Sequence, residues 1–192
     1  MKIPILDNGH GSMLNGEYLT SGKRSPKWPD GSQLFEGEFN RAIKARVIEM
    51  LNFEGIAYYD LVPETRDVSL STRVSRANKF HYENNKQTFL YSIHSNAGGG
   101  KGCEVFISES ASSNSLLLAQ EAEKRYLNMF DEPWRGIKRK NFTMIHKTAM
   151  PAALFEYFFM DNEYECKEYL MPRESRDLIA KHVYYTLIAT MI

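Results

Sequence analysis

Short apolar runs alternate with segments of helical periodicity along the chain. Apolar residues at positions 39, 42, 43, 47, 50 and 51 predict a helix over residues 38–54, which Gly55 ends. Similar spacing predicts helices over residues 70–85, 115–130 and 173–191. Apolar runs predict strands over residues 2–7, 56–62, 89–93, 102–108, 142–145 and 152–158. This alternation predicts a single-domain α/β fold with a mostly parallel central sheet of about six strands flanked by helices.

Two polar features stand out against this pattern of apolar runs: a long loop and a set of cationic side chains on one predicted helix. Residues 8–33 have no apolar periodicity and are rich in glycine and proline, which indicates a long functional or mobile loop. We expect the insert at residues 11–37 to form a lid or a cleft wall. Within the helix at residues 70–85, we expect the cationic side chains of Arg73, Arg76 and Lys79 to face water.

Composition narrows the classes of partner. The 192 residues carry 24 Lys and Arg against 24 Asp and Glu, a formal net charge of zero, which argues against a nucleic-acid binder. No apolar run approaches the roughly 20 residues of a membrane span, so no membrane partner is expected. The apolar stretch at residues 3–6 is too short for a signal peptide, which predicts synthesis in the cytoplasm without one. Cys103 and Cys166 are expected to be reduced thiols.

Two histidines lie at the ends of predicted strands. His10 belongs to Asp7-Asn8-Gly9-His10-Gly11, and His94 to Ser92-Ile93-His94-Ser95-Asn96. In α/β sheets ligands bind at the carboxyl ends of strands, so both imidazoles can hold one zinc ion with a carboxylate. Either histidine can instead be an ordinary turn or hydrogen-bonding residue. His81, His146 and His182 are expected to be surface or core residues.

Three carboxylates are candidates for the same chemistry. Glu36 and Glu38 both lie at the start of the first helix, where either can bind metal or simply favour the helix dipole. Glu156 interrupts the apolar run at residues 150–159, and an unpaired carboxylate is costly to bury there. Beside a metal it is suited to act as a general base, although pairing with an arginine or a polar sheet face would also explain it.

Taken together, these residues resemble the zinc-dependent N-acetylmuramoyl-L-alanine amidases of the amidase_3 type, found in bacterial wall-remodelling enzymes and phage endolysins. Seven motifs occur in the family's order and cover nearly the whole chain. They are Asp7-Asn8-Gly9-His10-Gly11, Glu38-Phe39-Asn40, the segment from Thr65 to Asn78, Ser92-Ile93-His94-Ser95-Asn96-Ala97, Gly102-Cys103-Glu104-Val105, Arg135-Gly136-Ile137-Lys138, and the segment from Pro151 to Asn162. Asn8 replaces the usual proline, and Tyr157-Phe158 replace the Thr-Gly that often precedes the family's phenylalanine.

The resemblance implies a function and a set of site residues. Zinc would be bound by His10, Glu38 and His94, and Glu156 would be catalytic. We favour Glu38 over Glu36 because Asn40 and the apolar face follow Glu38 as in the family. Residues 1–192 would form one zinc amidase catalytic domain with no wall-binding domain appended.

The implied substrate is peptidoglycan, cleaved between N-acetylmuramic acid and the L-alanine of the stem peptide. A lysin that reaches the wall after phage-type release, or by other export, fits these features. Arg135 or Lys138 is expected to hold a carboxylate or sugar acid of the wall. Two alternatives stay open: a zinc peptidase that cuts within the stem peptide, and a catalytically weak peptidoglycan-binding module.

Overall fold

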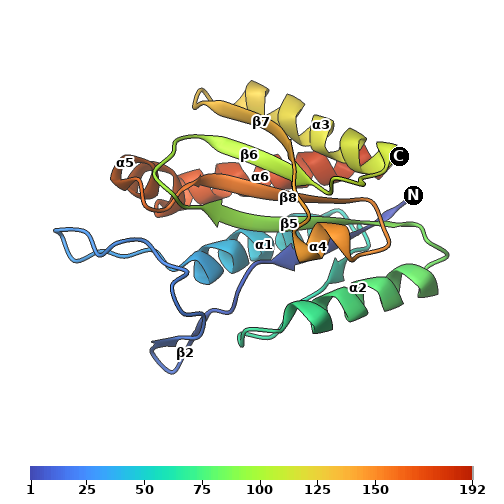
Figure 1. Cartoon of the computed structure of the whole chain (residues 1–192), viewed down its shortest axis with the longest axis horizontal. Coiled ribbons are helices and arrows are strands. Elements are labelled where there is room, and N and C mark those ends of the chain that lie inside the picture. Colours follow the sequence, from blue (N-terminus) through green and yellow to red (C-terminus); the bar gives the residue numbers. More distant parts are fainter. Residues whose placement is uncertain (192) are drawn as a thin grey trace.

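The structure is a computed structural model that describes residues 1–191. Within this range lies a six-stranded sheet in the order β4-β1-β5-β8-β6-β7 (Figure 1). Its strands are β1 (Ile3–Asn8), β4 (Tyr59–Asp60), β5 (Thr88–Asn96), β6 (Cys103–Ile107), β7 (Trp134–Arg139) and β8 (Ala152–Phe159). The helices are α1 (Glu36–Phe53), α2 (Leu70–Glu83), α3 (Ser113–Met129), α4 (Thr143–His146), α5 (Glu163–Glu165), the π-helix η1 (Cys166–Leu170) and α6 (Arg173–Thr190).

The sheet is mixed but mostly parallel, which confirms the predicted fold class. Strands β4, β1, β5 and β8 run parallel, whereas β6 pairs antiparallel with β8 and parallel with β7. The carboxyl ends of β1, β5 and β8 therefore meet at one edge of the sheet, where ligands bind in folds of this kind.

Helices cover both faces of the sheet (Figure 1). Helices α1, α3 and α6 pack on one face, where the larger apolar core includes Phe39, Val47, Leu118, Phe155 and Val183. Helices α2 and α4 lie on the other face over a smaller core that includes Ala77, Met144 and Leu154. None of the helices within residues 1–191 combines the length and apolarity that a bilayer crossing requires.

Two of the secondary-structure predictions are wrong. Residues 142–145, expected to be a strand, lie mainly in helix α4, where neighbouring Met144 and Ile145 are both buried instead of alternating. The sixth strand is β7, whose sequence Trp-Arg-Gly-Ile-Lys-Arg is mostly polar. Because β7 is an edge strand and none of its residues is fully buried, it lacks the apolar run by which a central strand is recognised.

The segment at residues 8–33 is more ordered than its composition suggests. It contains the hairpin of β2 (Met13–Leu14) and β3 (Glu17–Tyr18) and an isolated bridge between Arg24 and Phe35.

On α2, Arg76 and Lys79 are partly or largely exposed, but the prediction that Arg73 faces water is wrong, because its side chain is only 2% exposed. Cys103 and Cys166 are both buried and free.

Candidate metal and catalytic site

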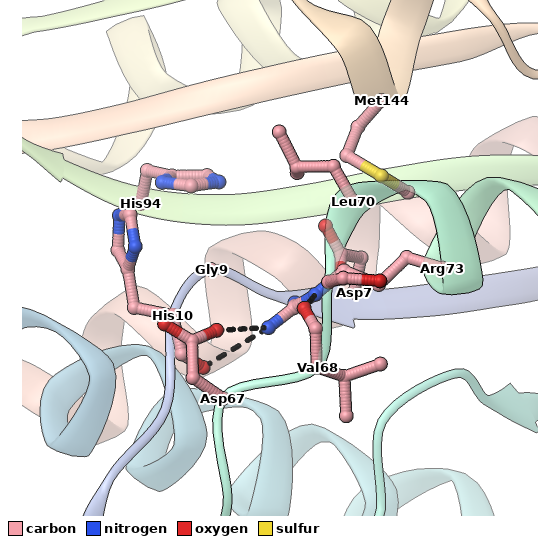
Figure 2. Close-up of a pocket in the computed structure, with 10 residues that line it drawn as sticks. Asp7, Gly9, His10, Asp67, Val68, Leu70, Arg73, His94 and Met144 are labelled. Atoms are coloured by element: carbon pink, nitrogen blue, oxygen red, sulfur yellow. Dashed lines mark hydrogen bonds and ion pairs between the residues drawn. The ribbon is translucent and has the colours of Figure 1, made fainter. Parts of the chain in front are cut away.

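The structure brings His10 and His94 together at the carboxyl edge of the sheet. Strands β1 and β5 are parallel neighbours with Asn8 opposite Ile93, so the residues that follow these positions emerge side by side. The two imidazole rings meet edge to face with their centroids 5.2 Å apart (Figure 2). Gly9 makes this approach feasible, since a Cβ there would lie 2.1 Å from Cε1 of His94.

The carboxylate between the two rings is Glu36. Its Oε1 lies 3.2 Å from Nε2 of His10 and 3.1 Å from Nδ1 of His94. Burial alone would raise the pKa of Glu36, but its close contact with His10 and its hydrogen bond with His94 hold that pKa well below the usual range. Burial conversely tends to lower the pKa of His94, and contact with Glu36 raises it overall.

Glu38 does not join this cluster: Glu36 occupies the place beside the two histidines that was expected for Glu38. Helix α1 begins at Glu36, so Glu38 lies about 200° further round the helix. There its two carboxylate oxygens accept hydrogen bonds of 2.9 and 3.0 Å from the guanidinium of Arg176 on α6. The Glu38 side chain is 39% exposed, whereas that of Glu36 is 2% exposed.

One sequence signal distinguishes the two glutamates. Asn40 lies four residues after Glu36, on the same face of α1, and its Nδ2 donates to the carbonyl of Gly9 beside His10. The buried positions Ile43, Lys44, Val47 and Leu51 continue that face. Asn40 therefore indicates that Glu36, and not Glu38, faces His10. Residues two apart on a helix, such as Glu38 and Asn40, point in nearly opposite directions.

The donor atoms of His10, Glu36 and His94 fit one metal ion. One ligand atom from each lies within 4.8 Å of the others. Nε2 of His10 is buried and has no hydrogen-bond partner of good geometry among residues 1–191. Two imidazole nitrogens and one carboxylate are a donor set that catalytic zinc takes, with a further position left for water or substrate.

Glu156 lies on β8 next to this cluster. In the sheet register it stands opposite His94 on β5 and opposite Glu104 on β6. Its Oε2 is buried without a hydrogen-bond partner in the described part of the chain. Burial raises the pKa of Glu156 to about 7, which is suited to proton exchange near neutral pH.

Arg135 and Lys138 on β7 are engaged by a protein carboxylate. Nε of Arg135 donates to Oε2 of Glu104 over 2.7 Å, and Nζ of Lys138 contacts the same oxygen. Oε1 of Glu104 accepts from Nδ2 of Asn96 over 2.7 Å. These cations therefore neutralise the carboxylate opposite Glu156, so the expectation that one of them holds a wall carboxylate has no support in their contacts.

Two cavities meet at the histidines and share His10, Leu70, His94 and Met144. One has a volume of about 510 Å³ and extends past Asp67, Val68 and Arg73 (Figure 2). The other, of about 340 Å³, extends past Lys23, Asn96, Phe142 and Glu156. The cluster is thus open on two sides, as suits a substrate that continues in both directions from the reacting bond.

The other three histidines lie outside the cluster, as the sequence suggested. Nδ1 of His81 is 2.7 Å from the hydroxyl of Thr88, and His182 on α6 is fully buried against Ala122 of α3. His146 is partly buried, with Nδ1 3.0 Å from the hydroxyl of Ser108. Each has a structural hydrogen-bonding role.

The chain is similar to known proteins in both sequence and fold. The family described as Amidase_3, N-acetylmuramoyl-L-alanine amidase, matches residues 5–189. N-acetylmuramoyl-L-alanine amidase CwlM of Bacillus licheniformis is 29% identical over 160 residues, which are 82% of this chain and 56% of that protein. The sporulation-specific N-acetylmuramoyl-L-alanine amidase of Bacillus subtilis (strain 168) is 32% identical over 122 residues, 62% of this chain and 45% of that protein. The chain thus spans about half the length of these curated relatives.

Solved structures share the fold over nearly the whole chain. The N-acetylmuramyl-L-alanine amidase Ami1 of Mycobacterium smegmatis superposes with a TM-score of 0.81 at 16% identity, covering 99% of this chain and 96% of that one. The N-acetylmuramoyl-L-alanine amidase of Clostridium difficile 630 has a TM-score of 0.80 at 23% identity, covering 98% and 96%. At these identities the similarity establishes the architecture alone.

Proposed function

We propose, from the premise that this chain belongs to the Amidase_3 family of N-acetylmuramoyl-L-alanine amidases, that it is a zinc-dependent peptidoglycan amidase. The bond cleaved would be the amide between the lactyl group of N-acetylmuramic acid and the L-alanine of the stem peptide. We further propose that residues 1–192 act as one catalytic domain in this reaction.

His10, Glu36 and His94 would hold the zinc ion. Two observations support this. Nε2 of His10 is buried and lacks a hydrogen bond of good geometry among residues 1–191, and one donor atom from each of the three residues lies within 4.8 Å of the other two. When bound, zinc supplies Lewis-acid chemistry, polarising the scissile carbonyl and lowering the pKa of water. The low pKa of Glu36 keeps its carboxylate ionised and ready to act as a ligand.

Glu156 would move the proton. Its Oε2, which has no hydrogen-bond partner among residues 1–191, would accept a proton from the attacking water, whose oxygen forms a bond to the carbonyl carbon. As the carbon–nitrogen bond breaks, Glu156 returns that proton to the leaving amine of L-alanine. The products are a free lactyl carboxylate on the glycan and a peptide with a free amino terminus.

The two cavities provide room for the groups on either side of the amide. Their shared lining by His10 and His94 would let glycan and peptide leave the reacting centre in different directions. Leu70 and Met144 line both cavities, so a substrate that occupied both would contact them.

The observation that carries this proposal is the convergence of His10, Glu36 and His94 next to a carboxylate oxygen of Glu156 that has no hydrogen-bond partner in the described part of the chain. The test is hydrolysis of purified peptidoglycan before and after metal removal with a chelator, followed by addition of one equivalent of zinc. Activity should disappear with the metal and return with zinc in the unaltered chain, but not in His94→Ala. Hydrolysis that continues in the demonstrably metal-free chain would contradict the proposal.

A further inference from the structure

We infer that Arg73 and Thr20, linked through Asp67, are positioning residues that fix the peptide group between His10 and Gly11 and thereby aim the His10 imidazole at the metal. The inference rests on the proposed zinc site. It assigns a function to the insert at residues 11–37, in which Thr20 lies.

The peptide group after His10 is bound on both of its polar atoms. Its carbonyl oxygen, which belongs to His10, accepts from NH2 of Arg73 over 3.2 Å. Its N–H, which belongs to Gly11, donates to the hydroxyl of Thr20 over 2.9 Å. A peptide plane held at both ends cannot rotate without breaking one of these hydrogen bonds.

The two groups that hold this peptide are themselves connected. The hydroxyl of Thr20 donates to Oδ2 of Asp67 over 2.6 Å, and Oδ1 of Asp67 lies 3.4 Å from NH2 of Arg73. The contacts form a closed ring that joins the insert, the loop before α2 and α2 itself around one peptide bond. Figure 2 shows Arg73 reaching from α2 toward Asp67 next to His10.

Arg73 is a firm anchor for this ring. It is nearly fully buried, and its guanidinium also donates to Oδ1 of Asp7 over 2.7 Å, to the carbonyl of Val68 over 2.9 Å and to the carbonyl of Asn8. A planar guanidinium with this many acceptors has one orientation, since any rotation would leave buried groups unsatisfied.

His10 needs such support because of its backbone. Its φ of +67° lies in the left-handed region, a backbone conformation that residues other than glycine adopt at a cost in free energy. That conformation turns the imidazole toward Glu36 and His94. Loss of either hydrogen bond would let the backbone relax toward negative φ and move Nε2 away from the other two donors.

Thr20 offers the cleanest test, because it is only partly buried and contributes a single hydroxyl. Thr20→Val keeps the shape of the side chain and removes its hydrogen bonds, whereas Thr20→Ser keeps the hydroxyl. Thr148→Val is a matched control, since that hydroxyl donates to the carbonyl of Met144 outside the ring. Zinc affinity would be measured by competition with a chromophoric chelator, and the stability of the zinc-free proteins by thermal unfolding.

We expect Thr20→Val to bind zinc about tenfold or more weakly, the range for loss of a partner that orients a metal ligand. Thr20→Ser and Thr148→Val should bind like the unaltered chain, and zinc-free Thr20→Val should unfold like the control. Unchanged zinc affinity in Thr20→Val, failure of Thr20→Ser to retain it, or a loss of zinc-free stability beyond that of the control would overturn the inference. Absence of zinc binding by the unaltered chain would contradict the proposed function, and the inference with it.

Discussion

Glu38 and Arg176 form a two-point ion pair between α1 and α6, with both oxygens of the carboxylate accepting from the guanidinium. Glu36, only two residues earlier, instead reaches His10 and His94. The first turn of α1 thus directs one glutamate to the contact between two helices and the other to the proposed metal site.

This division predicts opposite outcomes for two matched substitutions. Glu36→Gln should abolish stoichiometric zinc binding, since an amide oxygen is a much poorer zinc ligand than a carboxylate. Glu38→Gln should retain zinc and lose at most about 1 kcal/mol of unfolding free energy, because the ion pair is partly exposed. Metal analysis and denaturant unfolding of both variants check this, and zinc loss in Glu38→Gln alone would reverse the assignment.

Gly9→Ala should weaken zinc binding through His94. The added Cβ would lie 2.1 Å from Cε1 of that ring, so the imidazole must move. Gly55→Ala is a suitable control, because its φ of +66° strains the backbone but its Cβ would meet no atom within 4 Å among the described residues. Chelator competition should show weaker zinc binding in Gly9→Ala alone, and equal affinities would contradict the close packing of Gly9 against His94.

Glu156→Gln should lower turnover by about 10²–10⁴-fold while zinc content stays unchanged. The amide keeps the size of the side chain but cannot accept a proton. Glu83→Gln, on the exposed surface of α2, controls for loss of one negative charge. Rates on purified peptidoglycan with metal analysis of the same samples make the comparison. Near-normal turnover would reject the proton-transfer role, and loss of zinc would make Glu156 a ligand.

We expect protonation of His182 to lower the free energy of unfolding in acid. Its ring is fully buried, with Nδ1 2.6 Å from the hydroxyl of Tyr157 and Nε2 2.9 Å from the carbonyl of Ala122. Burial lowers its pKa from 6.5 to about 4, so the unfolded chain takes up this proton at a higher pH than the folded chain. The neutral His182 ring therefore contributes up to about 3 kcal/mol to the free energy of unfolding above pH 6.5. This contribution is lost as the pH falls to 4.

The matching measurement is denaturant unfolding at several pH values between 7 and 4. His182→Gln should show a shallower decline of unfolding free energy with falling pH than the unaltered chain, whatever its stability at pH 7. Identical slopes would show that the protonation of His182 is not coupled to unfolding.

Sequence patterns predicted the elements that lie in the centre of the fold. Strands β5 and β8 are buried on both faces and read as apolar runs, and α1 and α6 carry clear helical periodicity. The edge strand β7 was missed because its side chains are mostly polar, and the residues of α4 were assigned to a strand because four residues are too few to reveal a period.

At the site, the strand ends were enough to predict that His10 and His94 lie together, because the parallel register of β1 and β5 places Asn8 opposite Ile93 and the residues that follow emerge side by side. Glu38 was favoured over Glu36 because Asn40 and the apolar face follow Glu38 as in the family, whereas helical periodicity places Asn40 on the face of Glu36, four residues earlier. Arg73 could not be recognised as buried because its five acceptors include three backbone carbonyls, from Asn8, His10 and Val68, which no local pattern encodes.

The most direct test of the proposed function is the identity of the bond that is cut. Purified peptidoglycan would be treated with the zinc-loaded chain, and the soluble products would be analysed by mass spectrometry and amino-terminal labelling. We predict intact stem peptides that begin with a free L-alanine, together with glycan strands whose muramic acid carries a free lactyl carboxylate. Peptides that begin at a later residue of the stem, with L-alanine still attached to the glycan, would contradict it, as would a zinc-loaded chain that binds peptidoglycan without releasing any peptide.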